Sequence, residues 1–486
     1  MPDTDVLIIG GGPVGLTARA LLARWGMRTL LVERYAELSP YPRSRLINVR
    51  SMEIFHQLGI DALVAERGFA PEYGRVRFRD SFAAHDFASA AMIGIDAPIP
   101  QSPVIGVVTS QDRLEPTLLG AADTPLRFGA EVVGLAEEPD GVLATFADGT
   151  NVRARYVLAA DGANSTARQL LGIGAVGPGA LGTMATVVFE ADLQRQRAEA
   201  PAGVYFTASG SLLPIYPEGG WAWIGQVPEG ADHRELVARA IGADVPSEVS
   251  RVQNWVVNAF VAEHFCNGRI LLAGDAAHAI PPAGGLGLNV GIADVHNLCW
   301  KLAGVLSGWA EPKLLDSYET ERQPVAQLNL RQAVANSQLM MQAGQRRAEQ
   351  VQAGDVEGEI ELPWSESYFA QLGLVLGVAY GSAAAEPGTD YVPTLLPGHR
   401  MPHLDLGAGR STLDAVGEWF TVFTEDPTGW TEQTAPWPVR VEQLTGGDGT
   451  LLVRPDGHIA ARWDKGPAEG DELWRAQQTI SESGLA

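Results

Sequence analysis

Three glycines near the N-terminus have the spacing of a dinucleotide-binding turn. The segment DVLIIGGGPVGLTARALLARWGMRTLLVERY (5–35) predicts a buried strand, a tight turn, a helix and a second strand, with Gly10, Gly12 and Gly15 forming GxGxxG. Gly10 permits the turn, Gly12 lets the main chain approach a pyrophosphate, and Gly15 allows close helix–strand packing, while the helix N-terminus faces the anion. Because the whole strand–helix–strand unit is present, we expect a bound dinucleotide rather than a structural turn.

Glu33 ends the second predicted strand, where its carboxylate can accept hydrogen bonds from an adenosine ribose. An acidic residue at this position suits a ribose without a 2′-phosphate. FAD or NAD therefore fits the resident site better than NADP.

A second glycine-rich loop, NGRILLAGDAAHAIPPAGGLGLNVGIADVHNLCWKL (267–302), also follows a strand. Asp275 is expected at the carboxyl end of that strand, where open α/β sheets bind ligands. The glycines that let the main chain pass close to a planar group are Gly284, Gly285 and Gly287. The helix that begins near Leu288–Asn289 directs its N–H groups toward the same place.

This second loop lacks the Lys and Ser/Thr of a phosphate-binding P-loop, and a phosphate does not need a carboxylate such as Asp275 beside it. A carboxylate acceptor next to a positive helix terminus suits a polyol chain joined to a ring that becomes anionic when it is reduced.

Two further segments carry polar groups of the same kind. Arg43, Arg45 and Arg50 lie on a proline-interrupted loop and can reach a diphosphate or a ribityl chain, the alternative being a solvated basic loop. Asp161–Gly162 forms a turn after another strand, and Ser165 is expected to cap the helix that follows.

The chain resembles the FAD-dependent aromatic hydroxylases, the single-component class A flavoprotein monooxygenases, in their phenol and polyketide hydroxylase branch. The motifs cover most of residues 1–345 in the family's order: GGGPVG (10–15), PRSRLINVRSMEIF (42–55), SQDRLEPTLL (110–119), AADGANSTAR (159–168), GDAAHAIPPAGGLGLNVGIADVHNLCWKLA (274–303) and SYETERQPVA (317–326).

The resemblance implies a tightly bound FAD, with NADPH or NADH as a transient co-substrate and O2 as oxidant. It places the pyrophosphate at the first glycines, the adenosine ribose at Glu33, the ribityl chain at Asp275 and the flavin pyrimidine edge at the 287–289 backbone. The complete implied cofactor set is Gly10, Gly12, Pro13, Val14, Gly15, Glu33, Arg34, Arg43, Gln111, Val133 (main chain, near adenine), Asp161, Gly162, Asp275, Pro282, Gly285, Gly287, Leu288 and Asn289. The family's usual small residues are replaced here by Leu46–Ile47, and a frequent hydroxyl by Val290.

We expect an α/β fold with a Rossmann-like FAD-binding domain, an inserted antiparallel β-sheet substrate domain and a thioredoxin-like C-terminal domain. The predicted ranges are 1–175 and 266–345 for the FAD-binding domain, 176–265 (joined by 71–105) for the substrate sheet, 346–389 for a connecting segment and 390–486 for the C-terminal domain. Candidate wall residues of the substrate pocket are Tyr205, Tyr216 and Trp223, with packing in the core as the alternative.

The implied reaction is hydroxylation of a phenolic or polycyclic polyketide ring after oxygen adds to the flavin C4a position. His278 is a candidate general base, and a structural hydrogen bond from its ring is the alternative. Rival activities are Baeyer–Villiger insertion or epoxidation, an NAD-dependent dehydrogenase, and a catalytically silent FAD-binding protein that shelters a reactive intermediate.

Composition limits the partners. A formal charge of -23 disfavours nucleic acid and anionic membrane surfaces. The two cysteines lack CxxC spacing, so we expect neither a disulfide framework nor a metal site. The sequence predicts a cytoplasmic monomer or homodimer.

Overall fold

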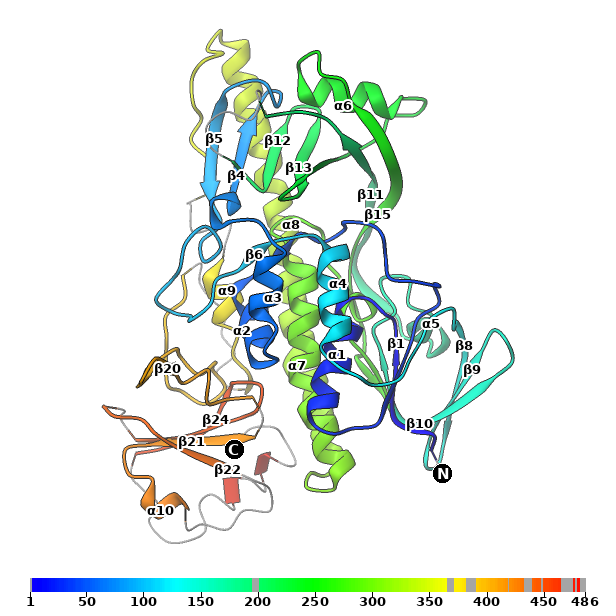
Figure 1. Cartoon of the computed structure of the whole chain (residues 1–486), viewed down its shortest axis with the longest axis vertical. Helices are drawn as coiled ribbons and strands as arrows, with labels where there is room; N and C mark the ends of the chain where they lie inside the picture. Colours follow the sequence, from blue (N-terminus) through cyan, green and yellow to red (C-terminus); the bar gives the residue numbers. More distant parts are fainter. Residues whose placement is uncertain are drawn as a thin grey trace.

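The computed structural model describes residues 2–194, 201–364, 371–381, 390–417, 419–431, 439–446, 449–464, 475–476 and 479–480. Parts of the predicted connecting segment 346–389 and of the predicted C-terminal domain therefore lie outside the described residues. The long helices form the middle of the molecule, the second sheet lies at the top, the mostly parallel sheet at the lower right and the C-terminal sheet at the lower left (Figure 1).

The first sheet has the strand order β16-β17-β10-β1-β2-β7, with the hairpin β8–β9 attached to β10; the pairs β16–β17 and β9–β10 are antiparallel. Its strands are β1 (Thr4–Ile9), β2 (Thr29–Val32), β7 (Leu126–Arg127), β8 (Val132–Glu138), β9 (Gly141–Phe146), β10 (Asn151–Ala159), β16 (Cys266–Asn267) and β17 (Ile270–Leu272). The pairs β1–β2, β1–β10, β10–β17 and β2–β7 are parallel. Their carboxyl ends consequently meet at one edge, where Gly10, Ala160 and Ala273 follow the strands.

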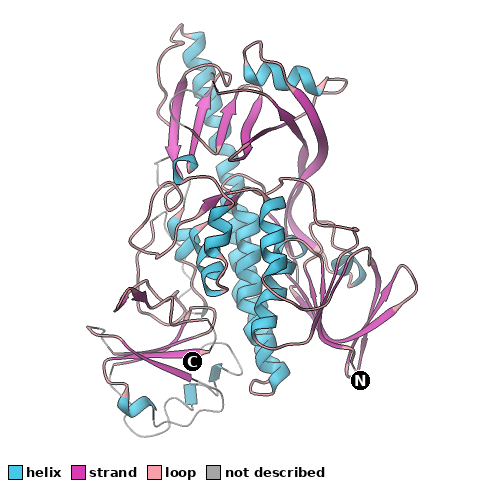
Figure 2. Ribbon diagram, in the orientation of Figure 1, coloured by secondary structure: helices cyan, strands magenta, loops and turns pink. Residues whose placement is uncertain are grey.

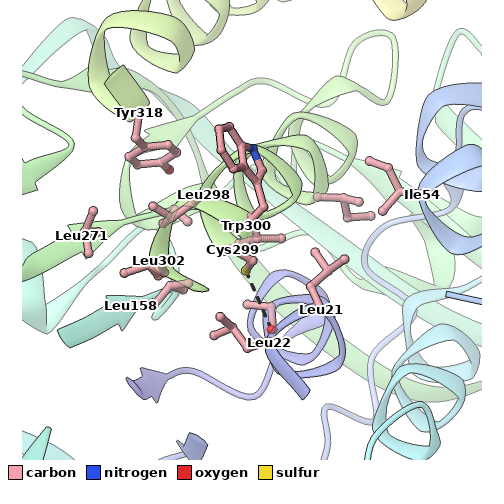
Figure 3. Packing of buried hydrophobic residues seen from close by; sticks show 14 of the residues in the cluster. Leu21, Leu22, Ile54, Leu158, Leu271, Leu298, Cys299, Trp300, Leu302 and Tyr318 are labelled. Carbon is pink, nitrogen blue, oxygen red and sulfur yellow. Dashed lines mark hydrogen bonds between the residues drawn. The ribbon is translucent and has the colours of Figure 1, made fainter. Parts of the chain in front are cut away.

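Helices cover this sheet and bury the largest hydrophobic core. They are α1 (Pro13–Arg24), α2 (Val49–Gln57), α3 (Asp61–Glu66), α4 (Gln111–Gly120), α5 (Thr166–Leu170), α7 (Leu286–Ser307) and α8 (Asp316–Gln352), with the short 3-10 helices η1 (Pro71–Tyr73), η2 (Gly274–Ala276) and η3 (Pro312–Leu315). Figure 3 shows Leu21 and Leu22 of α1 against Cys299 and Trp300 of α7. The central helix α7 is buried along almost its whole length because other elements enclose it, and its buried residues include the charged Asp294 and Lys301.

The second sheet runs in the order β18-β15-β11-β14-β13-β12-β4-β5, and α6 (His233–Ile241) packs on it. Its strands are β4 (Arg75–Arg79), β5 (Asp86–Ala91), β11 (Ala175–Glu190), β12 (Val204–Thr207), β13 (Gly210–Tyr216), β14 (Gly219–Gly225), β15 (Glu248–Ala262) and β18 (His278–Ala279). All pairs are antiparallel except β4–β12. Figure 2 shows this sheet in magenta at the top of the molecule. The short strands β3 (Leu46–Ile47) and β6 (Val107–Val108) form a separate antiparallel pair, and β6 lies between the second sheet and the helices α2 and α3 (Figure 1).

The C-terminal sheet has the order β22-β21-β23-β24. A parallel pair joined through α10 (Thr428–Thr431) is followed by an antiparallel hairpin, which is the arrangement of a thioredoxin-like domain. The strands are β21 (Phe420–Thr424), β22 (Val439–Gln443), β23 (Thr450–Val453) and β24 (Ile459–Trp463); α9 (Leu372–Leu376), β19 (Asp405–Gly407) and β20 (Arg410–Ser411) precede them. Neither cysteine of the chain lies in this domain, so it has no thiol redox chemistry.

Buried ion pairs fasten the C-terminal domain to the helices. Arg400 pairs with Glu53 of α2, and Arg454 donates to Glu321 of α8 at 2.6 Å. Lys301 of α7 donates to the same Glu321 carboxylate at 2.8 Å. Pairs of this kind fix the register of an interface, because separating one would leave an uncompensated buried charge.

None of the helices in the described ranges combines the length and apolar character that a bilayer crossing needs.

Candidate functional site

The turn after β1 has the close contacts that its glycines predict. Gly10 adopts φ +108°, and a Cβ there would lie 2.3 Å from the carbonyl oxygen of Ala160. A Cβ at Gly15 would lie 2.0 Å from the Gly10 oxygen. The helix α1 begins at Pro13 directly after this turn. Its first N–H groups are therefore presented at the carboxyl edge of the first sheet, where an anion can approach.

Glu33 lies against this turn. Its carboxylate accepts hydrogen bonds from the main-chain N–H of Gly11 at 2.6 Å and of Tyr35 at 3.0 Å. These two bonds hold the carboxylate at the edge of the sheet and leave lone pairs on both oxygens for a ribose. Arg34, next in the chain, is exposed and stacks on Tyr35 with its guanidinium 4.9 Å from the ring centre.

Asp275 lies in η2, directly after β17. The residue is exposed while its neighbours Gly274 and Ala276 are buried, so its carboxylate borders accessible space inside a protein-rich surrounding. That surrounding desolvates the carboxyl and raises its pKa, while the charges of His278 and Arg43 partly oppose the rise. A Cβ built at Gly287 would lie 4.0 Å from Asp275 Oδ1, which places this carboxylate beside the start of α7.

The first turn of α7 is fixed by the side chain of Asn289. Its Nδ2 donates to the carbonyls of Leu46 and Gly285, and its Oδ1 accepts from the Asn48 N–H and the Ser51 hydroxyl. Gly285 adopts the left-handed conformation at the N-cap. The loop and the helix terminus are thus rigidly attached to β3, the segment that carries Leu46. Pro282 is exposed and accepts from the Gly285 N–H, while Leu288 is half-buried.

His278 is fully buried and does not reach an accessible surface. Its Nε2 bonds to Asp294 at 2.6 Å, and its ring packs 6.1 Å from that of Phe265. The geometry favours the structural alternative over the general base, because a base must reach the proton that it removes.

The Asp161–Gly162 turn is held by its own helix. Asp161 accepts hydrogen bonds from the Ser165 hydroxyl and from the Ala167 N–H, and the predicted cap at Ser165 is confirmed by its bond from Arg168 N. The main chain of Asp161 lies beside Gly10, with a Cβ at Gly10 3.1 Å from the Asp161 Cα.

The start of α4 reaches the same region. Gln111 Nε2 donates to Glu115 at 2.7 Å, and the Ser39 N–H donates to the other Glu115 oxygen at 3.2 Å. Burial raises the Glu115 pKa to about 7, with Arg43 among the opposing influences. Sequence reasoning assigned no role to Glu115, although its (i, i+4) spacing from Gln111 on a helix signals the contact.

Val133 is exposed and falls at a β-bulge of β8 between Val132 and Gly134, where ladder pairing is interrupted. Its role toward adenine stays a prediction.

A polar cluster lies where the first sheet's helices meet the second sheet. Arg45 is buried, and its three guanidinium nitrogens lack a hydrogen-bond partner among the described residues. The Ser110 hydroxyl and Asp112 Oδ1 are likewise buried and unpaired within those residues. Tyr216 donates to the other Asp112 oxygen at 2.5 Å. We call Arg45, Ser110, Asp112 and Tyr216 the Arg45 cluster.

Electrostatics of the Arg45 cluster indicate a missing acceptor. Desolvation lowers the Arg45 pKa to about 10, and the attraction of Asp112 and Tyr216 for the guanidinium offsets only part of that decrease. Desolvation and the Asp112 contact raise the Tyr216 pKa to about 12. A buried guanidinium without an acceptor is costly, so this position suits a ligand that brings an oxygen. Sequence reasoning left Arg45 open between a ligand contact and a solvated loop, and the structure excludes the solvated loop.

Two of the three candidate wall residues are core residues instead. Tyr205 and Trp223 are almost fully buried in the cluster that packs the second sheet against α6. Trp223 donates its indole N–H to the Ser209 carbonyl at 2.8 Å, and the Tyr205 hydroxyl accepts from the Ala202 N–H. Alternation along a strand hides which face meets the ligand, so the sequence could not separate them from Tyr216.

The segments singled out from the sequence converge at one edge of the first sheet. The turn of β1, the turn after β10 and η2 follow parallel neighbours, while α7, α4 and β3 close around them. The glycine turn, acceptor carboxylates and two helix termini fit a dinucleotide carrying a polyol and a planar ring. Arg50 does not join them, since it donates to Glu53 and to the Asp456 carbonyl at the C-terminal interface.

Comparison with known proteins decides the family. A family model described as an FAD binding domain matches residues 3–333, and one described as the C-terminal part of aromatic-ring hydroxylases matches residues 394–482. The chain belongs to the FAD-dependent aromatic hydroxylases. Members of this family are flavin monooxygenases that bind FAD and work with NAD(P)H and O2.

Related aromatic hydroxylases align over nearly the whole chain. A putative polyketide hydroxylase of Streptomyces coelicolor is 37% identical, with 96% of this chain and 94% of the relative covered. The 2,4-dichlorophenol 6-monooxygenase of Cupriavidus pinatubonensis is 30% identical, with the same 96% and 94% covered.

Solved structures agree over the full length. RebC, a rebeccamycin biosynthetic enzyme solved with reduced flavin, superposes with a TM-score of 0.89 at 31% identity, covering 99% of both chains. Aklavinone-11 hydroxylase in complex with FAD and aklavinone gives a TM-score of 0.83 at 30% identity, also covering 99% of both chains.

Proposed function

We propose that this aromatic hydroxylase uses NADPH or NADH and O2 to hydroxylate a phenolic or polycyclic polyketide ring between its two large sheets. The observation that carries the proposal is the Arg45 cluster, whose buried and unpaired polar atoms suit a ring bearing oxygen substituents. The polyketide and phenol substrates of related proteins support the same substrate class.

The residues proposed to hold FAD are those that converge at the carboxyl edge of the first sheet. The glycine turn and α1 would take the pyrophosphate, Glu33 the ribose, Asp275 the ribityl hydroxyls and the first turn of α7 the pyrimidine edge. Bound FAD supplies the redox chemistry, accepting electrons from NAD(P)H and activating O2. In the balanced reaction one oxygen atom enters the ring as hydroxyl and the other leaves as water, while NAD(P)H is oxidised.

The protein's own contribution is orientation and charge. Arg45 would pair with a phenolic oxygen of the substrate and favour its phenolate form, which makes the ring more electron-rich. The Asp112–Tyr216 pair would fix a second oxygen by hydrogen bonding. Because the cluster is buried, the ring would react away from water.

The proposed domain division follows the sheets: 1–175 with 266–345, then 176–265 joined by 71–105, and 390–486. The pairing of β4 with β12 supports the assignment of 71–105 to the second sheet.

The decisive experiment screens simple phenols and hydroxylated polycyclic quinones for substrate-stimulated NADPH and NADH oxidation under isotope-labelled O2. We expect a product carrying one labelled oxygen as a hydroxyl on an intact ring. A labelled ester or epoxide, assigned by NMR, would establish the Baeyer–Villiger or epoxidising alternative. A flavin-loaded protein that incorporates no label from any compound would favour the silent FAD-binding protein.

The cofactor assignment has its own test. Asp275→Ala should be purified with much less FAD than the wild type, because the ribityl hydroxyls lose their acceptor. Full FAD occupancy in this variant would remove Asp275 from the site without affecting the proposed substrate class.

A further inference from the structure

Arg322 belongs to the SYETERQPVA motif of α8, to which no function has been assigned above. The side chain is buried and its three nitrogens contact three different partners. Nε donates to Asp294 Oδ1 at 2.9 Å, Nη1 to the Tyr380 hydroxyl at 3.2 Å and Nη2 to the Val290 carbonyl at 3.3 Å. A planar guanidinium offers donors on three separate nitrogens in a fixed geometry, whereas the three donors of an ammonium share one nitrogen on a flexible stem.

Two of these contacts lead to the segments proposed to bind flavin. Val290 lies in the first turns of α7, beside Asn289. Asp294, on the next turn, accepts the Gly274 N–H at 3.1 Å and the His278 Nε2–H at 2.6 Å, so it holds the loop on both sides of Asp275. Arg322 therefore joins the ribityl-side loop and the α7 terminus through one buried group.

The third contact leads to the C-terminal domain. The Tyr380 N–H donates to the Gly398 carbonyl at 3.0 Å, and its ring lies 4.2 Å from the ring of His458. Arg454 of the same domain lies over the Tyr380 ring at 5.2 Å. The C-terminal domain thus positions the Tyr380 hydroxyl that accepts the hydrogen bond from Arg322.

The buried ion pair between Asp294 and Arg322 is electrostatically favourable. Burial alone would raise the Asp294 pKa, but the charges and hydrogen bonds of His278 and Arg322 hold it below its ordinary value. A cavity of about 50 Å³ lies beside Val290, Arg322 and Tyr380. A cavity of this size admits a few water molecules.

We propose that Arg322 is a positioning residue for the flavin, and that the C-terminal domain, through Tyr380, sets the geometry of the Asp275 loop and the first turn of α7. This inference rests on the proposed role of those two segments in holding FAD. It gives the C-terminal domain a part in cofactor binding without any residue of that domain touching the cofactor.

The test compares Arg322→Lys and Tyr380→Phe with the control Arg347→Lys. Arg347 lies on the same helix, exposes little surface and donates twice to Asp80, at 3.1 and 2.7 Å, although the Asp80 carboxylate itself is partly exposed. For each full-length variant the FAD dissociation constant, the midpoint potential of bound FAD and the thermal midpoint are measured. Potential and affinity separate positioning from stability, since a structural defect alone lowers only the thermal midpoint.

We expect Arg322→Lys to raise the FAD dissociation constant by about two- to thirtyfold, the range for residues that couple to a site without touching it. The midpoint potential should become more negative, because a displaced α7 terminus stabilises the reduced, anionic flavin less. Tyr380→Phe, which keeps the ring contacts, should change both quantities in the same direction by a smaller amount. Arg347→Lys should lower only the thermal midpoint.

Unchanged FAD affinity and potential in Tyr380→Phe would overturn the part played by the C-terminal domain, and unchanged values in Arg322→Lys would overturn the inference entirely. Should Arg322→Lys not fold, Tyr380→Phe decides. Asp275→Ala is measured in parallel: if it weakens FAD binding while both positioning variants do not, this inference fails and the proposed FAD site stands. If Asp275→Ala leaves FAD binding intact, the premise about that loop fails.

Discussion

Replacing Arg45 with methionine should stabilise the protein while weakening its binding of substrate. Methionine fills a similar volume with an unbranched, apolar side chain, so it can occupy the position against Phe69 without overpacking it. Arg45 itself is buried 5.5 Å over that ring with no described hydrogen-bond acceptor for its nitrogens. The change therefore removes a buried charge rather than an ion pair.

The size of the expected stabilisation follows from the pKa of the Arg45 guanidinium. Its lowering from 12.5 to about 10 corresponds to about 3 kcal/mol of penalty for keeping the charge buried in the ligand-free protein. The variant also loses the cation–π contact between Arg45 and Phe69, which destabilises it by about 1 kcal/mol. We expect a net gain of about 2 kcal/mol, constant at every pH below about 10 because the group is charged in both the folded and the unfolded state.

The same substitution should weaken substrate binding although it stabilises the fold. A hydrogen bond to a charged partner contributes about 1.5 to 3 kcal/mol, so substrate affinity should fall about 10- to 150-fold. FAD affinity should change little, because the assigned cofactor residues are elsewhere. The assay pairs denaturant unfolding of the FAD-free protein with substrate titration of the FAD-bound enzyme. Arg127→Met is the control, since Arg127 lies at the same 5.5 Å from Phe146 but is exposed.

Two results would refute this reasoning. A variant less stable than the wild type would show that Arg45 has a partner that stabilises it in the free protein. Unchanged substrate affinity would show that the buried guanidinium serves no ligand of this class.

Two pH effects follow from other groups. Glu115 has a folded pKa of about 7, above its ordinary 4.5, so the FAD-free protein loses up to about 3 kcal/mol of stability as pH rises from 4.5 to about 7. In Glu115→Gln the free energy of unfolding, measured with denaturant, should decline less steeply between pH 5 and 8. An identical slope in the two proteins would contradict the assignment. His56 bridges Asp61 and Asp414 at 2.9 and 2.8 Å, and the two carboxylates raise its pKa against the opposing effect of burial. Its stabilisation is therefore present at pH below 6.5 and lost as pH rises through the raised pKa. Unfolding of His56→Gln should differ from wild type more at pH 5.5 than at pH 8.5, and equal differences at the two values would show that protonation of His56 does not matter.

Local sequence patterns predicted the parts of this protein that depend on main-chain geometry. The turn at Gly10 needs a positive φ, which only glycine adopts without strain, and the GxGxxG motif therefore predicts this turn. The cap at Ser165 follows from a hydroxyl that competes for free N–H groups. These features are encoded within a few residues of one another.

The Arg45 cluster could not be predicted in this way. Arg45 directly precedes β3 and Tyr216 lies on β13 of the second sheet, so the two residues meet only in the folded chain. The same holds for Arg322, whose partners Asp294 and Tyr380 come from separate elements. It also explains the errors at Tyr205 and Trp223, because strand alternation does not tell which face of a sheet is covered by α6.

The sequence by itself thus determined the family, the glycine turns, the acceptor carboxylates and the order of the elements, since each is written in contiguous residues whose conformational preferences are local. Only the tertiary structure decided which polar side chains are buried without partners and which aromatic rings belong to the core. The physical reason is that desolvation depends on everything packed around a group, and that surrounding is assembled from distant parts of the chain.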